Sequence, residues 1–126
     1  MKTLNIIEAA YRATLEEQDD PVVWIIHALK GAGAEQGVVL RANAVNYAVT
    51  AQGVPPLAFG ARRQKHGPRL AEAVGSLIGK GVEVYVVSDD LVERGLQGEE
   101  LIGELKTLRK VDLPRLCAGY DQVWHW

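Results

Sequence analysis

The sequence predicts one α/β domain in which strands and helices alternate. Short apolar segments that favour strands are followed by segments with helix-start and helix-stop residues. The chain has 126 residues, 48% hydrophobic and 24% charged, which suits a single globular domain with its own core. We therefore expect one domain over residues 1–126.

Apolar, β-branched composition predicts four strands. They are Leu4–Ile7, Gly37–Arg41, Val82–Val87 and Asp121–Trp126. Caps, prolines and glycines predict the helices between them. These are residues 20–31, 43–49, 68–78, 89–95 and 112–119, with a further helical turn at 99–105.

The first helix is recognised by its ends, with Asp20 as N-cap, Pro21 at the first position and Lys30–Gly31 as the stop. Val22–Leu29 is apolar on every side, so periodicity alone does not separate a buried helix from a buried strand, and the caps favour a helix. Such a helix needs a cover on both faces, the sheet on one and another surface, such as a second subunit, on the other. Trp24 is then expected in the core or in that subunit interface.

The later elements follow from the same residue types. Asn43 is the expected N-cap of the second helix, and the break at Gln52–Pro56 contains two prolines that exclude a continuing helix. Pro68 opens the third helix, and Asp112 caps the last one before Gly119 ends it. The terminal strand should bury one face of its alternating side chains.

Charge and composition exclude several classes of function. A net charge of −2 gives no general attraction to nucleic acid or to an anionic membrane. No segment approaches the roughly 20 apolar residues that span a bilayer, and the start of the sequence lacks a secretory signal, so we expect a cytoplasmic protein. One cysteine allows no intrachain disulfide and no zinc-type spacing is present, so neither metal nor cofactor is expected.

Several segments together resemble the DsrE/DsrF-like sulfur-relay family. They are Lys30–Ala34, Arg41–Val45, Gly81–Ser88, Arg94–Leu96 and Tyr120–Trp124. The resemblance covers nearly the whole chain and is strongest over residues 70–98. It implies a flavodoxin-like three-layer domain with a mostly parallel five-stranded sheet, assembled into homo-oligomers that are trimers or hexamers. It also implies transfer of persulfide sulfur between a cysteine of this family and a sulfur-carrier protein.

Position 88 departs from this family. Sulfur-carrying members have a cysteine there, after a strand and at the start of a helix, where the helix N-terminus favours a thiolate. This chain has Ser88, whose hydroxyl does not take up sulfane sulfur. We expect Ser88 to cap the helix, and Asp89 and Asp90 to complement the helix dipole. A functional alternative makes Ser88 and Asp89 part of a ligand- or partner-binding rim.

Cys117 is the other candidate for sulfur chemistry. It shares a helical face with Leu113 and Leu116, which predicts a thiol packed on the sheet, with a raised pKa. The alternative places Cys117 in a subunit cleft beside Arg115 as a catalytic thiol.

Further polar residues are candidate ligand or partner contacts. In the fold that the resemblance implies, Arg41, Asn43 and Asn46 share the carboxyl edge of the sheet with Ser88. The alternative for Asn46 is a local hydrogen bond. Arg62 and Arg63 belong to a basic loop that is either solvated or docks an anion or a partner.

Three functional hypotheses remain open. The first is a DsrE-like partner-binding protein of sulfur trafficking that lacks the persulfide cysteine. The second is a sulfurtransferase that uses Cys117. The third is a small-ligand or anion-binding module at the carboxyl edge of the sheet.

Overall fold

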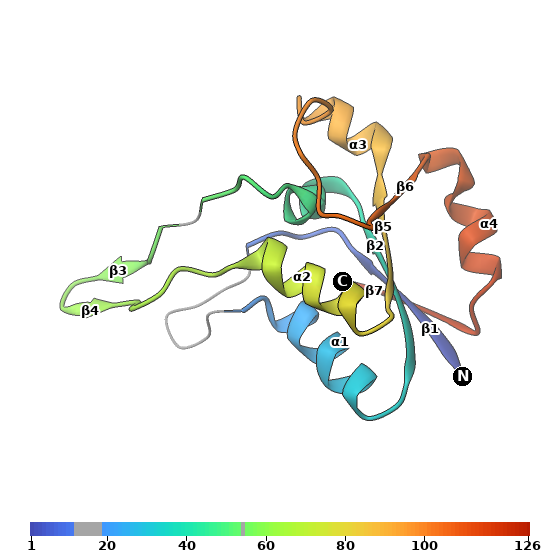
Figure 1. Cartoon of the computed structure of the whole chain (residues 1–126), viewed down its shortest axis with the longest axis horizontal. Helices are drawn as coiled ribbons and strands as arrows, with labels where there is room; N and C mark the ends of the chain where they lie inside the picture. The colour runs from blue at the N-terminus through green and yellow to red at the C-terminus, as the bar shows by residue number, and fades with distance from the viewer. Residues whose placement is uncertain (12–18, 54) are drawn as a thin grey trace.

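The computed structural model describes residues 1–11, 19–53 and 55–126, and these form a flavodoxin-like α/β domain (Figure 1). The central sheet contains β1 (Lys2–Ile7), β2 (Glu35–Leu40), β5 (Glu83–Val87), β6 (Lys106–Leu108) and β7 (Gln122–His125). Its order is β6-β5-β2-β1-β7, and all of these pairings are parallel. The helices are α1 (Pro21–Gly31), α2 (Leu70–Gly79), α3 (Ser88–Glu93) and α4 (Leu113–Ala118), with 3₁₀ helices η1 (Ala42–Ala48) and η2 (Lys110–Asp112).

Side chains alternate between the two faces of the sheet and build a core on each. The larger core lies under α1, α2 and η1, where Val38, Leu40 and Val84 of the central strands are buried. The smaller core lies under α4, where Leu4 and Val39 pack with Leu113 and other apolar residues. The three layers confirm the predicted fold class, with a larger core on the α1 and α2 face.

Helix α1 begins as the sequence predicts. The Asp20 carboxylate accepts hydrogen bonds from the backbone N–H groups of Val22 and Val23, and Pro21 opens the helix. Within α1 the buried face includes Val23 and Ile26, whereas Trp24 is 61% exposed. Of the two expected positions of Trp24, the core is therefore wrong, because Trp24 is on the face of α1 that turns away from the sheet, and the subunit interface stays a prediction.

Two elements differ from the prediction. Residues 99–105 contain no helix, and Leu101 instead forms an antiparallel bridge with Val49. Strand β6 follows, and its short sequence Lys106–Leu108 carries too little apolar signal to be recognised alone. The predicted helix at residues 43–49 is the 3₁₀ helix η1. Contacts with neighbouring elements decide these local structures.

The predicted basic loop contains a short antiparallel hairpin that projects from the domain (Figure 1). It is formed by β3 (Ala58–Phe59) and β4 (Arg62–Arg63). The two strands turn at Gly60, whose φ of 58° lies in the left-handed region that glycine adopts readily. The hairpin extends away from the carboxyl edge of the sheet (Figure 1).

Across the described ranges, no helix combines the length and the apolar character that crossing a membrane requires.

Candidate functional site

The carboxyl edge of the parallel sheet brings together most of the predicted site residues. Ser88 is the first residue of α3, directly after β5, and its hydroxyl donates a 3.3 Å hydrogen bond to the carbonyl oxygen of Leu108. The N-cap position is Val87, and no side chain caps this helix. The predicted capping role of Ser88 is therefore wrong, because its hydroxyl bonds to the neighbouring strand β6.

Asp89 and Asp90 join α3 to its neighbours. Asp89 Oδ1 accepts a 2.8 Å hydrogen bond from the backbone N–H of Lys110, which lowers the pKa of the Asp89 carboxyl. Asp90 is 3% exposed, and its Oδ2 accepts a 2.7 Å hydrogen bond from the N–H of Ala42. Ala42 has a φ of 49°, so this bond holds a strained residue at the turn after β2. Both carboxylates also lie in the first turn of α3, as the dipole argument expects.

Asn43 and Asn46 lie beside this group. Arg94, at the end of α3, donates from Nε to Asn43 Oδ1 at 3.2 Å. The amide of Asn46 donates to the carbonyl oxygen of Asn43 at 2.9 Å, as the local alternative predicts. The expected N-cap role of Asn43 is wrong, since Arg41 occupies that position and the side chain of Asn43 is used by Arg94.

A charged cluster that the sequence analysis missed occupies the ends of β1, β2 and β7. Glu8 Oε1 lies 3.1 Å from Arg41 Nε and 3.0 Å from His125 Nε2. The cluster sits where the strand order reverses around β1, which is the usual ligand position in open parallel sheets. Glu8 directly follows β1 and Arg41 directly follows β2, so the sequence could have placed these two residues side by side. It gave no sign that β7, which carries His125, pairs with β1.

A shallow hollow of about 450 Å³ opens beside Ser88. Its lining residues are Ser88, Asp89, Val92, Glu93 and Arg109. Two carboxylates face one guanidinium there, which does not favour an anion. The hollow therefore gives no support to the anion-binding hypothesis at this edge.

Cys117 lies on α4, on the face that packs against the sheet. It is half-buried and contacts the smaller core, which includes Leu4, Val39 and Leu113. This placement agrees with the predicted apolar helix face. A hollow of about 350 Å³ is lined by Arg115 and Leu116, but Cys117 is not part of its lining. Arg62 and Arg63 are exposed on the projecting hairpin, so the structure does not bring them together with Ser88 (Figure 1).

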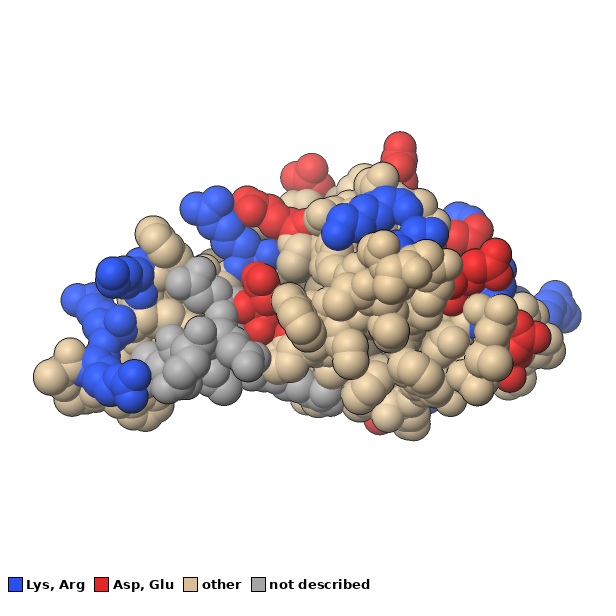
Figure 2. Space-filling view, turned by 90° about the horizontal axis from the view of Figure 1, so that it is seen from below, with Lys and Arg blue, Asp and Glu red and all other residues tan. Residues whose placement is uncertain are grey.

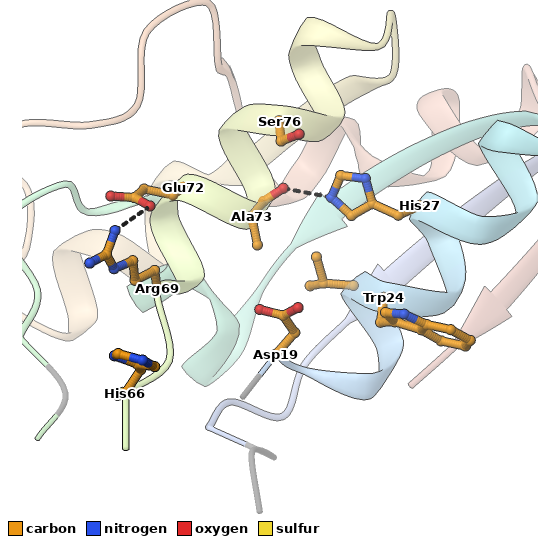
Figure 3. Close-up of a pocket in the computed structure, with 10 residues that line it drawn as sticks. Asp19, Trp24, His27, His66, Arg69, Glu72, Ala73 and Ser76 are labelled. Atoms are coloured by element: carbon orange, nitrogen blue, oxygen red, sulfur yellow. Dashed lines mark hydrogen bonds and ion pairs between the residues drawn. The ribbon is translucent and has the colours of Figure 1, made fainter. Parts of the chain in front are cut away.

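A larger hollow lies between α1 and α2, with a volume of about 620 Å³ (Figure 3). His27 bridges its walls, since Nε2 lies 2.8 Å from the Ala73 carbonyl oxygen and the Lys80 ammonium is 3.0 Å from Nδ1. Only the Nε2–H tautomer donates to the carbonyl and accepts from the ammonium at once. Trp24 and Asp19 line the same hollow from α1 and the residues before it. The sequence analysis did not identify this hollow.

Within the described residues, no three His, Cys, Asp or Glu side chains are grouped closely enough to hold a metal ion.

The fold and site define a flavodoxin-like α/β domain with polar and charged residues at the carboxyl edge of its sheet. Among solved structures, it is similar to the YchN protein of E. coli, with a TM-score of 0.75, 17% identity and full coverage of both chains. It is also similar to MTH1491, a protein of unknown function from Methanobacterium thermoautotrophicum. That match has a TM-score of 0.63 and 16% identity, and covers 97% of this chain and 96% of the other. At these identities the likeness extends to the fold.

No protein-family model matches the chain, and no curated protein does.

Proposed function

We propose that this protein is a DsrE-like, partner-binding component of cytoplasmic sulfur trafficking that does not itself carry a persulfide at the edge of its sheet. The observation that carries the proposal is the hydroxyl of Ser88 at the start of α3. In the family that the sequence resembles, this position holds the sulfur-carrying cysteine. The edge of the sheet around Ser88 carries polar side chains, but position 88 has no cysteine that could act as the nucleophile.

The contacts of Ser88 support a structural role for its hydroxyl. Nucleophilic serine requires a general base within hydrogen-bond reach. The Ser88 hydroxyl donates instead to a backbone carbonyl, and His125 is paired with Glu8. Cys117 is half-buried and packs on the smaller core, which restricts the access of a donor persulfide to its thiol. Binding therefore suits this edge better than sulfur transfer.

The first test is persulfide loading, measured by intact mass. A thiolate attacks the sulfane sulfur of a donor persulfide, the S–S bond breaks, and the donor leaves as its thiolate. We expect the native protein to gain no sulfur, because Ser88 has no thiol and Cys117 is packed. The Ser88→Cys/Cys117→Ser variant should gain one sulfur, removable by reductant, and Cys117→Ser is the control.

Loading of the native protein that disappears in Cys117→Ser would contradict the proposal and favour the sulfurtransferase hypothesis. If the Ser88→Cys/Cys117→Ser variant is folded by circular dichroism but does not load, this would contradict the proposal that position 88 corresponds to the sulfur-carrying cysteine of the family.

The second test is partner binding, measured by calorimetric titration with a persulfidated sulfur-carrier protein. Arg109→Glu, beside Ser88, should weaken binding at least fivefold, because it adds a third carboxylate to the hollow. Arg115→Glu makes the same charge change on α4 and should leave binding unchanged. Equal losses in both variants would contradict a partner site at this edge.

A further inference from the structure

The hairpin and the α1–α2 hollow are complementary surfaces of one molecule. We call residues 55–66 the arm and the hollow between α1 and α2 the groove. We propose that the arm of one copy docks in the groove of a second copy, so that the chain assembles head to tail. This inference concerns assembly and stands independently of the sulfur role.

The arm is a short hairpin that hydrogen bonds between Leu57 and Gln64 close. The backbone N–H of Gln64 donates to the Leu57 carbonyl at 2.8 Å, and Gln64 Oε1 accepts from the Leu57 N–H at 3.2 Å, which closes the hairpin. Toward its tip, Phe59 is 65% exposed and pairs across the strands with Arg62. A large aromatic side chain exposed on a projecting, pre-formed element is typical of an interface anchor. The arm therefore offers contact area with little conformational entropy left to lose.

Charge on the arm is of one sign. Residues 55–71 contain four Lys and Arg and no Asp or Glu, so the rest of the chain holds ten cations against sixteen carboxylates. The basic residues of the arm itself are Arg62, Arg63 and Lys65, all exposed. Figure 2 shows the same separation, since the end of the molecule formed by the arm carries Lys and Arg and no Asp or Glu on this face. A basic arm on an otherwise acidic molecule favours docking to a second copy.

The groove supplies the complementary groups. It is lined by the exposed Trp24, by the Asp19 carboxylate and by Glu72 (Figure 3). Glu72 is paired only loosely, with Arg69 at 3.6 Å, and both side chains are about three-quarters exposed. Such surface pairs contribute little and are readily exchanged. The lining thus offers one exposed indole and two carboxylates, with the Arg69 guanidinium beside Glu72, to an arm that presents one aromatic ring and several cations.

Each copy carries both halves of this contact at different places. The last residue of the arm, His66, and the following Gly67 line the copy's own groove, while the hairpin extends away from α1 and α2 (Figure 1). The tip is therefore directed toward another molecule. A contact between unlike surfaces of identical chains is heterologous, and it closes into a ring when the rotation permits. The arm also gives the exposed face of α1 the second cover that its apolar sequence requires.

The test measures the mass of the native protein by light scattering over a range of concentrations. We expect a multiple of the 13.8 kDa chain that dissociates on dilution and at high salt. The arm variant Arg63→Glu/Lys65→Glu and the groove variant Asp19→Lys/Glu72→Lys should each be monomeric. A mixture of the two should associate again, because alternating copies restore opposite charges at every contact.

The control Lys110→Glu/Arg115→Glu makes the same charge change as the arm variant on η2 and α4, and should assemble as the native protein does. Phe59→Ala should raise the dissociation constant roughly tenfold or more. Circular dichroism establishes that each variant is folded. A native protein that is monomeric at every concentration, assembly that persists in both reversed variants, or a mixture of folded variants that stays monomeric would each overturn the proposal.

Discussion

At the scale of single residues, Gly37 makes room for Tyr120. A β-carbon at position 37 would lie 2.2 Å from the Tyr120 hydroxyl oxygen, which packs against β2. Burial of this hydroxyl raises the pKa of Tyr120 to about 12, and the Lys2 ammonium lies 4.7 Å from the ring centroid. The ring therefore covers the strand at a place where only glycine fits.

We expect Gly37→Ala to lower the free energy of unfolding by about 1–3 kcal/mol, because the added methyl group overpacks the site. Urea denaturation measures the change. Gly31→Ala is the matched control, since nothing lies within 4 Å of the added carbon there. Tyr120→Phe removes the closest atom, so the double variant should lose less than the two single changes together. Strict additivity of the two changes would contradict this contact.

At the scale of elements, predicted N-caps divide into two kinds. Asp20 caps α1 as its sequence predicts, whereas Asn43, Ser88 and Asp112 make no capping hydrogen bond with their side chains. Asn43 accepts a hydrogen bond from Arg94, Ser88 donates to Leu108 of β6, and Asp112 pairs with Arg109. Residue type indicates where a helix begins, but the neighbouring elements decide what its polar side chain binds.

Among these residues, Asp20 makes the most deeply buried hydrogen bonds. It is fully buried, its Oδ1 caps Val22 and Val23, and its Oδ2 accepts a 2.6 Å hydrogen bond from the Tyr47 hydroxyl. Asp20→Ala should lower the free energy of unfolding by about 2–4 kcal/mol, from a lost cap and from donors left without this acceptor. Asp20→Asn keeps one carbonyl oxygen and should cost less. Chemical denaturation measures both.

Asp112→Ala is the control for this comparison, because Asp112 occupies an N-cap position without a capping bond. Its effect should stay within about 0.5 kcal/mol, because Asp112 is partly exposed and its ion pair with Arg109 lies at the surface. Equal losses for the alanine variants of Asp20 and Asp112 would contradict the proposed importance of the cap.

At the scale of the whole molecule, the two cores are unequal. The larger core joins α1, α2 and η1 to the central strands, whereas the smaller one rests on the six-residue α4. Strand β7 forms one edge of the sheet, and its residues are exposed, while β2 is central and mostly buried. Local opening should therefore begin on the α4 and β7 side.

Hydrogen exchange in the native state tests this order. Amides of β2 and β5 should be the most protected, with opening free energies close to the free energy of global unfolding. Amides of α4 and β7 should exchange at least tenfold faster. The physical reason is the smaller apolar area that must be exposed to open the α4 side. Uniform protection across the four elements would contradict the division into two unequal cores.

The sequence by itself determined the fold class, the helix at residues 20–31 and its cap, because caps and apolar runs act within a few residues along the chain. The resemblance to the DsrE/DsrF-like family also placed Ser88, Asn43 and Asn46 at one edge of the sheet. Only the tertiary structure joined Glu8, Arg41 and His125, made a strand of the polar Lys106–Leu108, and opened the hollow between α1 and α2. These features depend on strand order and helix packing, which bring together residues far apart in the chain.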